Sequence, residues 1–178
     1  MPADAPSDPP VFGWREHVAM PAWGIRRLRA KLDTGARTSA LHVEDVEELE
    51  PDPAVPWTVR SGPEGGGDTD LPVVRFSVLT GPRAEPRRVQ VVAPVVGHTV
   101  IRDTRARPER RPIVRTRVVC GPLDREIEIS LTDRTGMNFR LLLGRLALQD
   151  AALVDPARGF RVTDPPARPL RPGPEDRE

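Results

Sequence analysis

The chain is poor in the residue types that form cross-links and metal clusters. It has one cysteine in 178 residues, Cys120. A single cysteine excludes an intrachain disulfide and a zinc site built on several cysteines, so we interpret Cys120 as a packing residue. The histidines His17, His42 and His98 are scattered, and no His-Glu-x-x-His motif is present. His42 and Glu44 could offer two ligands from one strand face, but no third is evident, so we expect no bound metal.

Long apolar runs and aromatic residues are also scarce. No apolar run approaches the roughly 18 residues of a membrane span, and the N-terminus lacks a signal-peptide pattern. We therefore expect a soluble cytoplasmic protein without a membrane partner. Nucleic-acid binding is disfavoured by a net charge of +1, the absence of tyrosine and a count of only four phenylalanines. Residues 65–67 (GGG) lack the lysine and the strand–helix context of a phosphate loop, so no nucleotide cofactor is expected.

The remaining pattern predicts a mostly β domain over residues 12–162. Residues 1–11 and 163–178 are rich in proline and charge, which predicts disordered tails. A long loop is expected at residues 50–70 and a helix of about two turns at residues 145–152. Many short strands followed by one helix favour a closed barrel. The expected strands are 12–21, 26–32, 41–49, 72–80, 88–96, 113–120, 125–131, 137–143 and 160–162.

One stretch combines a strand with a reactive group. Residues 27–32 alternate basic and apolar side chains, and the alternation stops at Asp33, Thr34 and Gly35. A carboxylate is thus expected where a buried strand turns into a tight loop, which a glycine allows. Lys31 is the single lysine of the chain, which suggests that an ammonium group is needed beside Asp33; chance is the alternative.

We interpret Asp33 as half of an aspartic-peptidase site. Two carboxylates about 3 Å apart share one proton, so one can activate water while the other protonates the carbonyl oxygen. The chain carries one Asp-Thr-Gly, because residues 133–136 (DRTG) contain an inserted arginine. The second carboxylate must then come from a two-fold homodimer. A bare Asp-Thr-Gly is also a common turn, and its context decides between the two readings.

The context resembles the retropepsin-like aspartic peptidases. Residues 32–36 (LDTGA) and 142–145 (LLGR) together carry the likeness. A bacterial branch, the RimB-like proteins, which are also labelled ATP-dependent zinc proteases, is the nearer match. Four segments look like that branch: 13–16 (GWRE), 31–42 (KLDTGARTSALH), 111–114 (RPIV) and 137–145 (MNFRLLLGR). The resemblance implies a retropepsin-like closed β-barrel with one short C-terminal helix and a link to an ATP-grasp ligase that adds glutamates to a ribosomal protein.

The resemblance also implies roles for individual residues. Asp33 would be catalytic, Thr34 would brace the loop, and Gly35 would shape it. Ala36 and Arg37 would contact substrate, with Arg37 standing where viral relatives have an aspartate. The expected supporting residues are Lys31, Gly144 and Arg145.

An arginine-rich flap is expected between residues 96 and 112. Residues 102–117 hold seven arginines against Asp103 and Glu109. Capture of an acidic peptide would use Arg102, Arg105 and Arg107; a solvated hairpin is the alternative.

Three functions remain open. The first is a homodimeric aspartic endopeptidase acting on an acidic or glutamate-rich peptide. The second is a non-catalytic module of the same fold that binds a peptide or a ribosome. The third, nucleic-acid binding through residues 102–117, is the least favoured.

Overall fold

The computed structural model describes residues 8–50, 72–82, 84–102, 108–132 and 138–164. Most of the expected 50–70 loop and most of both expected tails lie outside these ranges. Arg105 and Arg107 lie outside them as well, and the side chain of Arg102 is not described.

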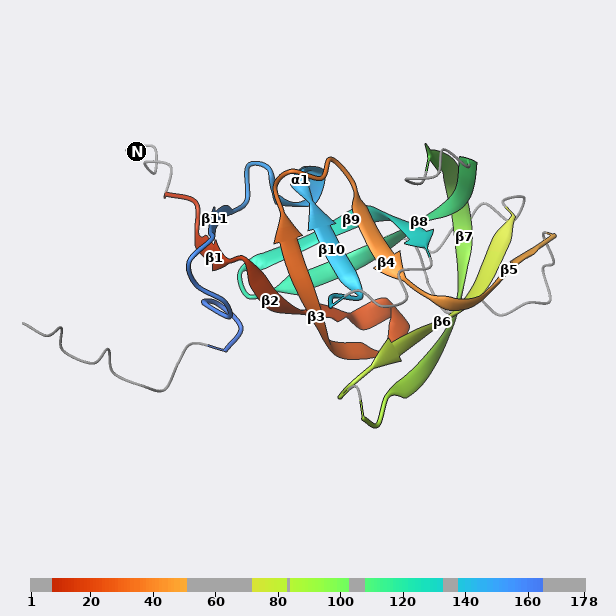
Figure 1. The fold of residues 1–178 in the computed structure, drawn as a ribbon, viewed down its shortest axis with the longest axis horizontal. Helices are drawn as coiled ribbons and strands as arrows, with labels where there is room; N and C mark the ends of the chain where they lie inside the picture. Colours follow the sequence, from red (N-terminus) through yellow and green to blue (C-terminus); the bar gives the residue numbers. More distant parts are fainter. Residues whose placement is uncertain (1–7, 51–71, 83, 103–107, 133–137, 165–178) are drawn as a thin grey trace, which may run out of the picture.

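A closed barrel forms the centre of the molecule (Figure 1). Its strands are β2 (Arg15–Met20), β3 (Ile25–Asp33), β10 (Leu141–Gly144), β4 (Ser39–His42), β9 (Leu123–Thr132) and β8 (Pro108–Cys120). A pairing between Ala19 of β2 and Val119 of β8 closes the ring. The expected mostly β, closed-barrel architecture is therefore confirmed.

Three further strands extend the sheet from β8 and project to one side of the barrel (Figure 1): β7 (Arg87–Arg102), β6 (Val73–Thr80) and β5 (Glu44–Leu49). The first half of β7 pairs with β6, and its second half pairs with β8. The short 3-10 helix η1 (Pro21–Trp23) joins this extension to the barrel, because the Trp23 ring meets the Phe76 ring edge-on at 5.4 Å between centroids.

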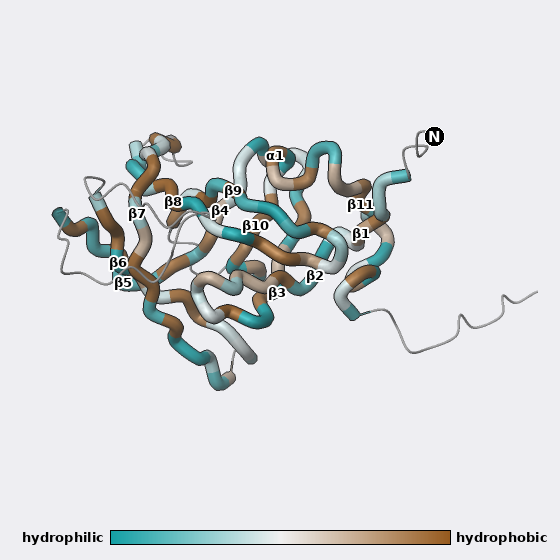
Figure 2. Tube along the Cα trace, turned by 180° about the vertical axis from the view of Figure 1, so that it is seen from behind, coloured by the Kyte–Doolittle hydropathy of each residue, from teal (hydrophilic) through white to brown (hydrophobic). Residues whose placement is uncertain are grey.

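Alternating apolar residues supply the core, as a two-residue period requires. Every second residue of β2 is buried, and β8 follows the same pattern over most of its length. Figure 2 shows the alternation as short brown and teal segments along the strands. The largest fully buried side chains include Trp23, Phe12, Phe76 and Met20.

The helix is shorter than the sequence predicts. Helix α1 (Arg145–Leu148) makes one turn, because Gln149 leaves the helical region with φ −57° and ψ 141° and Asp150 has a positive φ of 61°. No helix in the described part of the chain is long and apolar enough to cross a membrane.

Several strand boundaries also differ from expectation. The prediction of a strand at residues 160–162 is wrong. A short strand β11 (Leu153–Asp155) pairs in parallel with β1 (Val11–Gly13) instead. The β7–β8 hairpin is longer than expected, and the expected 41–49 strand is divided at Val43. β4 then belongs to the barrel and β5 to the extension.

Candidate active site

Asp33 is the last residue of β3 and begins the loop at residues 34–38. Strand β10 lies between β3 and β4, parallel to the first and antiparallel to the second. Its register places Gly144 opposite Asp33. Two segments that are far apart in the sequence, the Asp-Thr-Gly and the Leu-Gly-Arg, therefore lie side by side at one end of the barrel.

The Asp33 carboxylate is held by its own loop. The backbone N–H groups of Gly35 and Ala36 donate to Oδ1 at 3.2 and 3.3 Å. The Lys31 ammonium donates to Oδ2 at 3.0 Å. The Lys31 hydrogen bond is the main cause that lowers the pKa of Asp33, and it outweighs the partial burial that acts in the opposite direction. In a single copy, Asp33 is therefore an ionised carboxylate with both oxygens engaged.

Gly144 and Arg145 fix the loop through their backbones. Arg145 N–H donates to the Ala36 carbonyl at 2.7 Å, and Gly144 N–H donates to Ser39 Oγ at 3.1 Å. A Cβ at Gly144 would lie 2.4 Å from the Thr38 carbonyl carbon, so only glycine fits there. The sequence pointed to both residues as supports, and the structure brings both against the loop; the Arg145 side chain itself is exposed.

The outer side of the loop is open. Thr34, Gly35, Arg37 and Thr38 are exposed, whereas Ala36 is half-buried. Among the described residues no carboxylate lies within ion-pair distance of Arg37. Leu146, whose N–H donates to the Arg37 carbonyl, adds an apolar side chain that is 44% exposed. This end of the barrel presents an accessible surface with Asp33 at its base.

The arginines of the β7–β8 hairpin are less available than the sequence suggests. Arg111 pairs with Glu109 at 2.6 Å, Arg115 with Glu128 at 3.0 Å and Arg117 with Asp124 at 2.5 Å. Arg110 contacts the His98 ring at 3.1 Å. Glu109 on β8 itself and two carboxylates on the neighbouring strand β9 thus offset much of the positive charge of residues 108–117.

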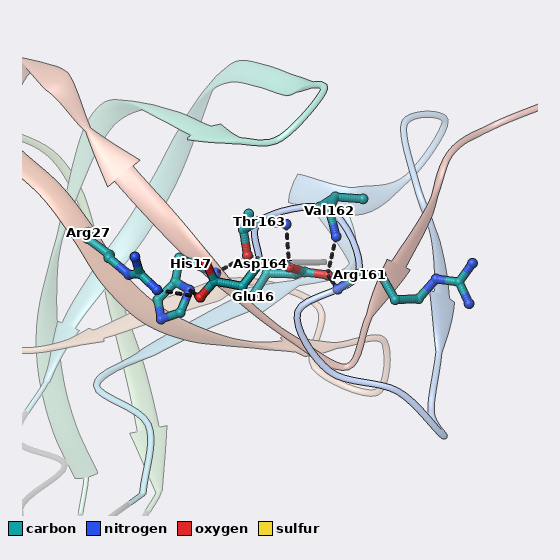
Figure 3. Close-up of polar contacts among 7 residues, drawn as sticks. All are labelled: Glu16, His17, Arg27, Arg161, Val162, Thr163 and Asp164. Atoms are coloured by element: carbon teal, nitrogen blue, oxygen red, sulfur yellow. Dashed lines mark hydrogen bonds and ion pairs between the residues drawn. The ribbon is translucent and has the colours of Figure 1, made fainter. Parts of the chain in front are cut away.

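The sequence analysis gave no role to Glu16. Its side chain is fully buried and its carboxylate accepts five hydrogen bonds. Four of the donors are the backbone N–H groups of Arg161, Val162 and Thr163 and the Thr163 hydroxyl (Figure 3). The fifth is the backbone N–H group of Gly13. The available signal was its position, because Glu16 occupies an inward-facing place in the alternation of β2.

Glu16 anchors the segment of residues 158–164, which we call the C-terminal strap. The strap lies beside β2, because Phe160 N–H donates to the Arg15 carbonyl and His17 N–H donates to Thr163 Oγ1. Its last residue, Asp164, contacts Arg27 and His17 (Figure 3). The His17 ring stacks on Phe160 with 4.6 Å between centroids, and its Nδ1 lies 3.2 Å from Asp164 Oδ2. Burial and then Arg27 lower the pKa of His17, so its ring is neutral near pH 7 and Arg27 is the main partner of Asp164.

Other candidate groups have no catalytic setting. Within the described ranges, no three histidine, cysteine, aspartate or glutamate side chains are grouped as metal ligands would be. Cys120 is buried, and burial raises the pKa of its thiol to about 12, which leaves it protonated and unreactive near neutral pH.

Comparison with known proteins shows that most of the chain is similar to one protein family. The model of a family described as RimB-like, retropepsin-like aspartic endopeptidase RimB, matches residues 11–57 and 68–165. A solved structure from Legionella pneumophila, Lpg0085, of unknown function, is 27% identical with a TM-score of 0.63, and the match covers 88% of this chain and 100% of that one.

Curated relatives carry a different name. A protein of Desulfotalea psychrophila named probable alpha-L-glutamate ligase is 30% identical over 149 residues, which are 83% of this chain and 28% of that protein. A protein of Shewanella pealeana with the same name is 27% identical over 84% of this chain and 29% of its own length. The chain therefore spans less than a third of these relatives.

Proposed function

The chain belongs to the RimB-like family of retropepsin-like aspartic endopeptidases, and from this premise we propose that it is an aspartic peptidase acting as a homodimer. One observation carries the proposal. The Asp33 carboxylate is fixed by two backbone N–H groups at the base of an exposed loop, and the chain has no second Asp-Thr-Gly.

A two-fold axis through the open end of the barrel would bring two copies of Asp33 together. An isologous interface pairs a residue near the axis with its own copy. The exposed surface around Leu146 and the 34–38 loop supports an interface there, because a second copy would bury it. Val11 and Leu153, both exposed apolar residues of the β1–β11 pair, would extend the contact.

The paired carboxylates would hydrolyse an amide without a covalent intermediate. The ionised Asp33 takes a proton from water while the water oxygen bonds to the carbonyl carbon, and the protonated partner donates to the carbonyl oxygen. In the tetrahedral gem-diol, one hydroxyl then gives its proton to the ionised carboxylate while the amine takes a proton from the protonated one as the C–N bond breaks, which leaves a carboxylic acid, an amine and a dyad with one shared proton. The two Asp33 carboxyl groups titrate as a coupled pair. The Lys31 ammonium in each copy favours the ionised form of its own Asp33.

An acidic peptide is the substrate class we propose. Lys31, which pairs with Asp33, and Arg37 flank Asp33 in the sequence, and Arg37 has no carboxylate partner within the described ranges. Relatives named probable alpha-L-glutamate ligase hold a segment similar to this chain within longer proteins. This supports a functional link between the domain and a ligase of that kind.

The decisive experiment compares the wild type with Asp33→Asn on a labelled glutamate-rich peptide. The variant should lose hydrolysis by several orders of magnitude, because an amide cannot serve as the base. It should keep the melting temperature to within a few degrees and the sedimentation behaviour of the wild type. Equal cleavage by both proteins would sink the proposal.

The second candidate is a non-catalytic peptide- or ribosome-binding module. It is favoured by the satisfied state of Asp33, whose two oxygens already have three donors within one copy. In that case the wild-type dimer cleaves nothing, and Asp33→Asn mainly loosens the 34–38 loop, which would appear as a lower melting temperature.

A further inference from the structure

A cavity of about 530 Å³ opens on the outside of the barrel, away from the Asp33 end of β3. Its walls come from β2, from the start of β3, from the turn between β6 and β7, and from residues just before β10. Arg140 ties two of these walls together, because its Nη1 donates to the Leu79 carbonyl at 2.9 Å. The volume is that of a typical ligand pocket rather than a packing defect. The lining residues are His17, Arg27, Leu28, Arg29, Gly81, Pro82, Asn138 and Arg140.

The lining is strongly basic. In the described part of the chain, three arginines and no carboxylate line the cavity. Among the described residues no carboxylate lies within ion-pair distance of Arg29, whose guanidinium sits 5.5 Å from the Phe139 ring centroid. The hairpin arginines of β8, by contrast, are largely paired with glutamates and aspartates. The cavity thus gathers three arginines: Arg27 pairs with Asp164, Arg140 is hydrogen-bonded, and Arg29 has no ion-pair partner among the described residues.

The chain itself places one carboxylate at the rim of this cavity. Asp164, at the end of the C-terminal strap, pairs with Arg27 and approaches the His17 ring. The strap is held there by the buried carboxylate of Glu16. The rim therefore already binds a carboxylate carried on a peptide backbone.

The spacing of the arginines matches an extended peptide. Arg27 and Arg29 are exposed alternate residues of β3, so they are separated by about 6.6 Å along the strand. Alternate side chains of an extended ligand repeat at the same interval. Lys31 continues the row, and the step from Arg29 to Asp33 is about 13 Å.

We propose that this cavity binds an acidic peptide segment in an extended conformation, and that Asp164 competes with the ligand for Arg27. The segment lays carboxylates against Arg27 and Arg29, with Arg140 on the facing wall. The site is separate from Asp33, so the proposal does not depend on hydrolysis.

The test is a binding titration in the Asp33→Asn background, where the probe cannot be cut. The probe is a fluorescently labelled oligo-glutamate peptide, with oligo-glutamine of equal length as the uncharged comparison. Arg29→Gln should weaken oligo-glutamate binding by about five-fold or more, because a charge-assisted contact is lost. Asp164→Asn should strengthen it by about two-fold or more, because Arg27 is released. Arg115→Gln is the matched control on another surface and should change nothing.

Several outcomes overturn the proposal. If Arg29→Gln binds oligo-glutamate as tightly as its parent protein does, the cavity is not the binding site. If Asp164→Asn binds it more weakly, Asp164 does not compete with the peptide for Arg27. Equal binding of oligo-glutamine would exclude recognition of carboxylates. Displacement of the peptide by inorganic phosphate at equal anion concentration would assign the arginines to phosphate instead. Arg29 and Asp164 are exposed, so both variants should fold. Thermal melting of each variant verifies this.

Discussion

Lys31 is the residue that most directly sets the charge of Asp33. Its ammonium is the main cause of the lowered pKa of that carboxyl. The ionised carboxylate therefore contributes stability above the ordinary pKa of aspartate, and this contribution is lost as the pH falls through the lowered value. The same contact should set the acid limit of activity, because the dyad needs one ionised carboxylate.

Replacing Lys31 with methionine should raise the pKa of Asp33. The methionine keeps an unbranched side chain that is one atom shorter and removes the donor, while the Gly35 and Ala36 N–H groups remain. An NMR titration of the Asp33 carboxyl carbon measures the effect, and the acid limb of the pH–rate profile should move upward with it. Arg37→Met is the control, since no contact joins Arg37 to Asp33. An unchanged Asp33 titration in Lys31→Met would contradict the assignment.

Glu16 is a polar residue whose loss should strongly destabilise the fold. Glu16→Ala removes a fully buried carboxylate and leaves four backbone N–H groups and a hydroxyl without their acceptor. We expect a loss of about 3 kcal/mol or more in unfolding free energy, measured by urea titration.

The control for Glu16 is Glu126→Ala. Glu126 is an exposed partner of Arg115 at 3.7 Å, and its loss should change the unfolding free energy by no more than about 0.5 kcal/mol. Equal effects of the two substitutions would show that the strap is not anchored by Glu16.

At the scale of elements, the packing of β10 against the 34–38 loop depends on Gly144. Gly144→Ala would push a methyl group to 2.4 Å from the Thr38 backbone, so the loop must move. We expect a loss of about 1–3 kcal/mol in unfolding free energy. We also expect hydrolytic activity to fall by more than this loss of stability alone would cause. Gly97→Ala is the control, because its added methyl would meet nothing closer than 4.0 Å. A Gly144→Ala protein with wild-type stability and activity would contradict this packing.

The sequence predicted the elements that alternate strongly and missed those shaped by distant contacts. The strand leading into Asp33 and its hairpin partner β2 were both predictable from local pattern. The strand expected at 160–162 was not formed, because the N–H groups of Arg161 and Val162 bind the Glu16 carboxylate instead of a strand. That partner is about 145 residues away in sequence, and no local pattern contains it.

The candidate site was also predictable where its residues belong to a recognisable local motif, and not where they come from separate strands. Local pattern and resemblance located Asp33, Gly144 and Arg145, and the structure brings them together. The basic cavity was missed because its arginines come from separate strands and none of them is unusual in an arginine-rich sequence. Charge counts along one segment instead drew attention to the hairpin, where cross-strand carboxylates offset the arginines.

At the scale of the whole molecule, the proposed peptidase needs two copies. Mixing equal amounts of wild type and Asp33→Asn, with exchange of subunits, gives about one quarter wild-type dimers. Activity should therefore fall to about one quarter of that of the same total amount of wild type, if both carboxylates are required. About one half would remain if each subunit acted alone, and that result would contradict a shared dyad. Analytical ultracentrifugation at the assay concentration checks that dimers form and exchange.

The position of β10 between β3 and β4 also has a consequence during synthesis. The two flanking strands leave the ribosome early, but the strand that joins them begins at Leu141. A nascent chain that ends before this residue lacks Gly144 and Arg145, whose backbone N–H groups hold the Asp33 loop. Such late, long-range pairing is a slow step of folding. The loop that carries Asp33, the proposed catalytic residue, would therefore be completed only after nearly all of the domain has been translated.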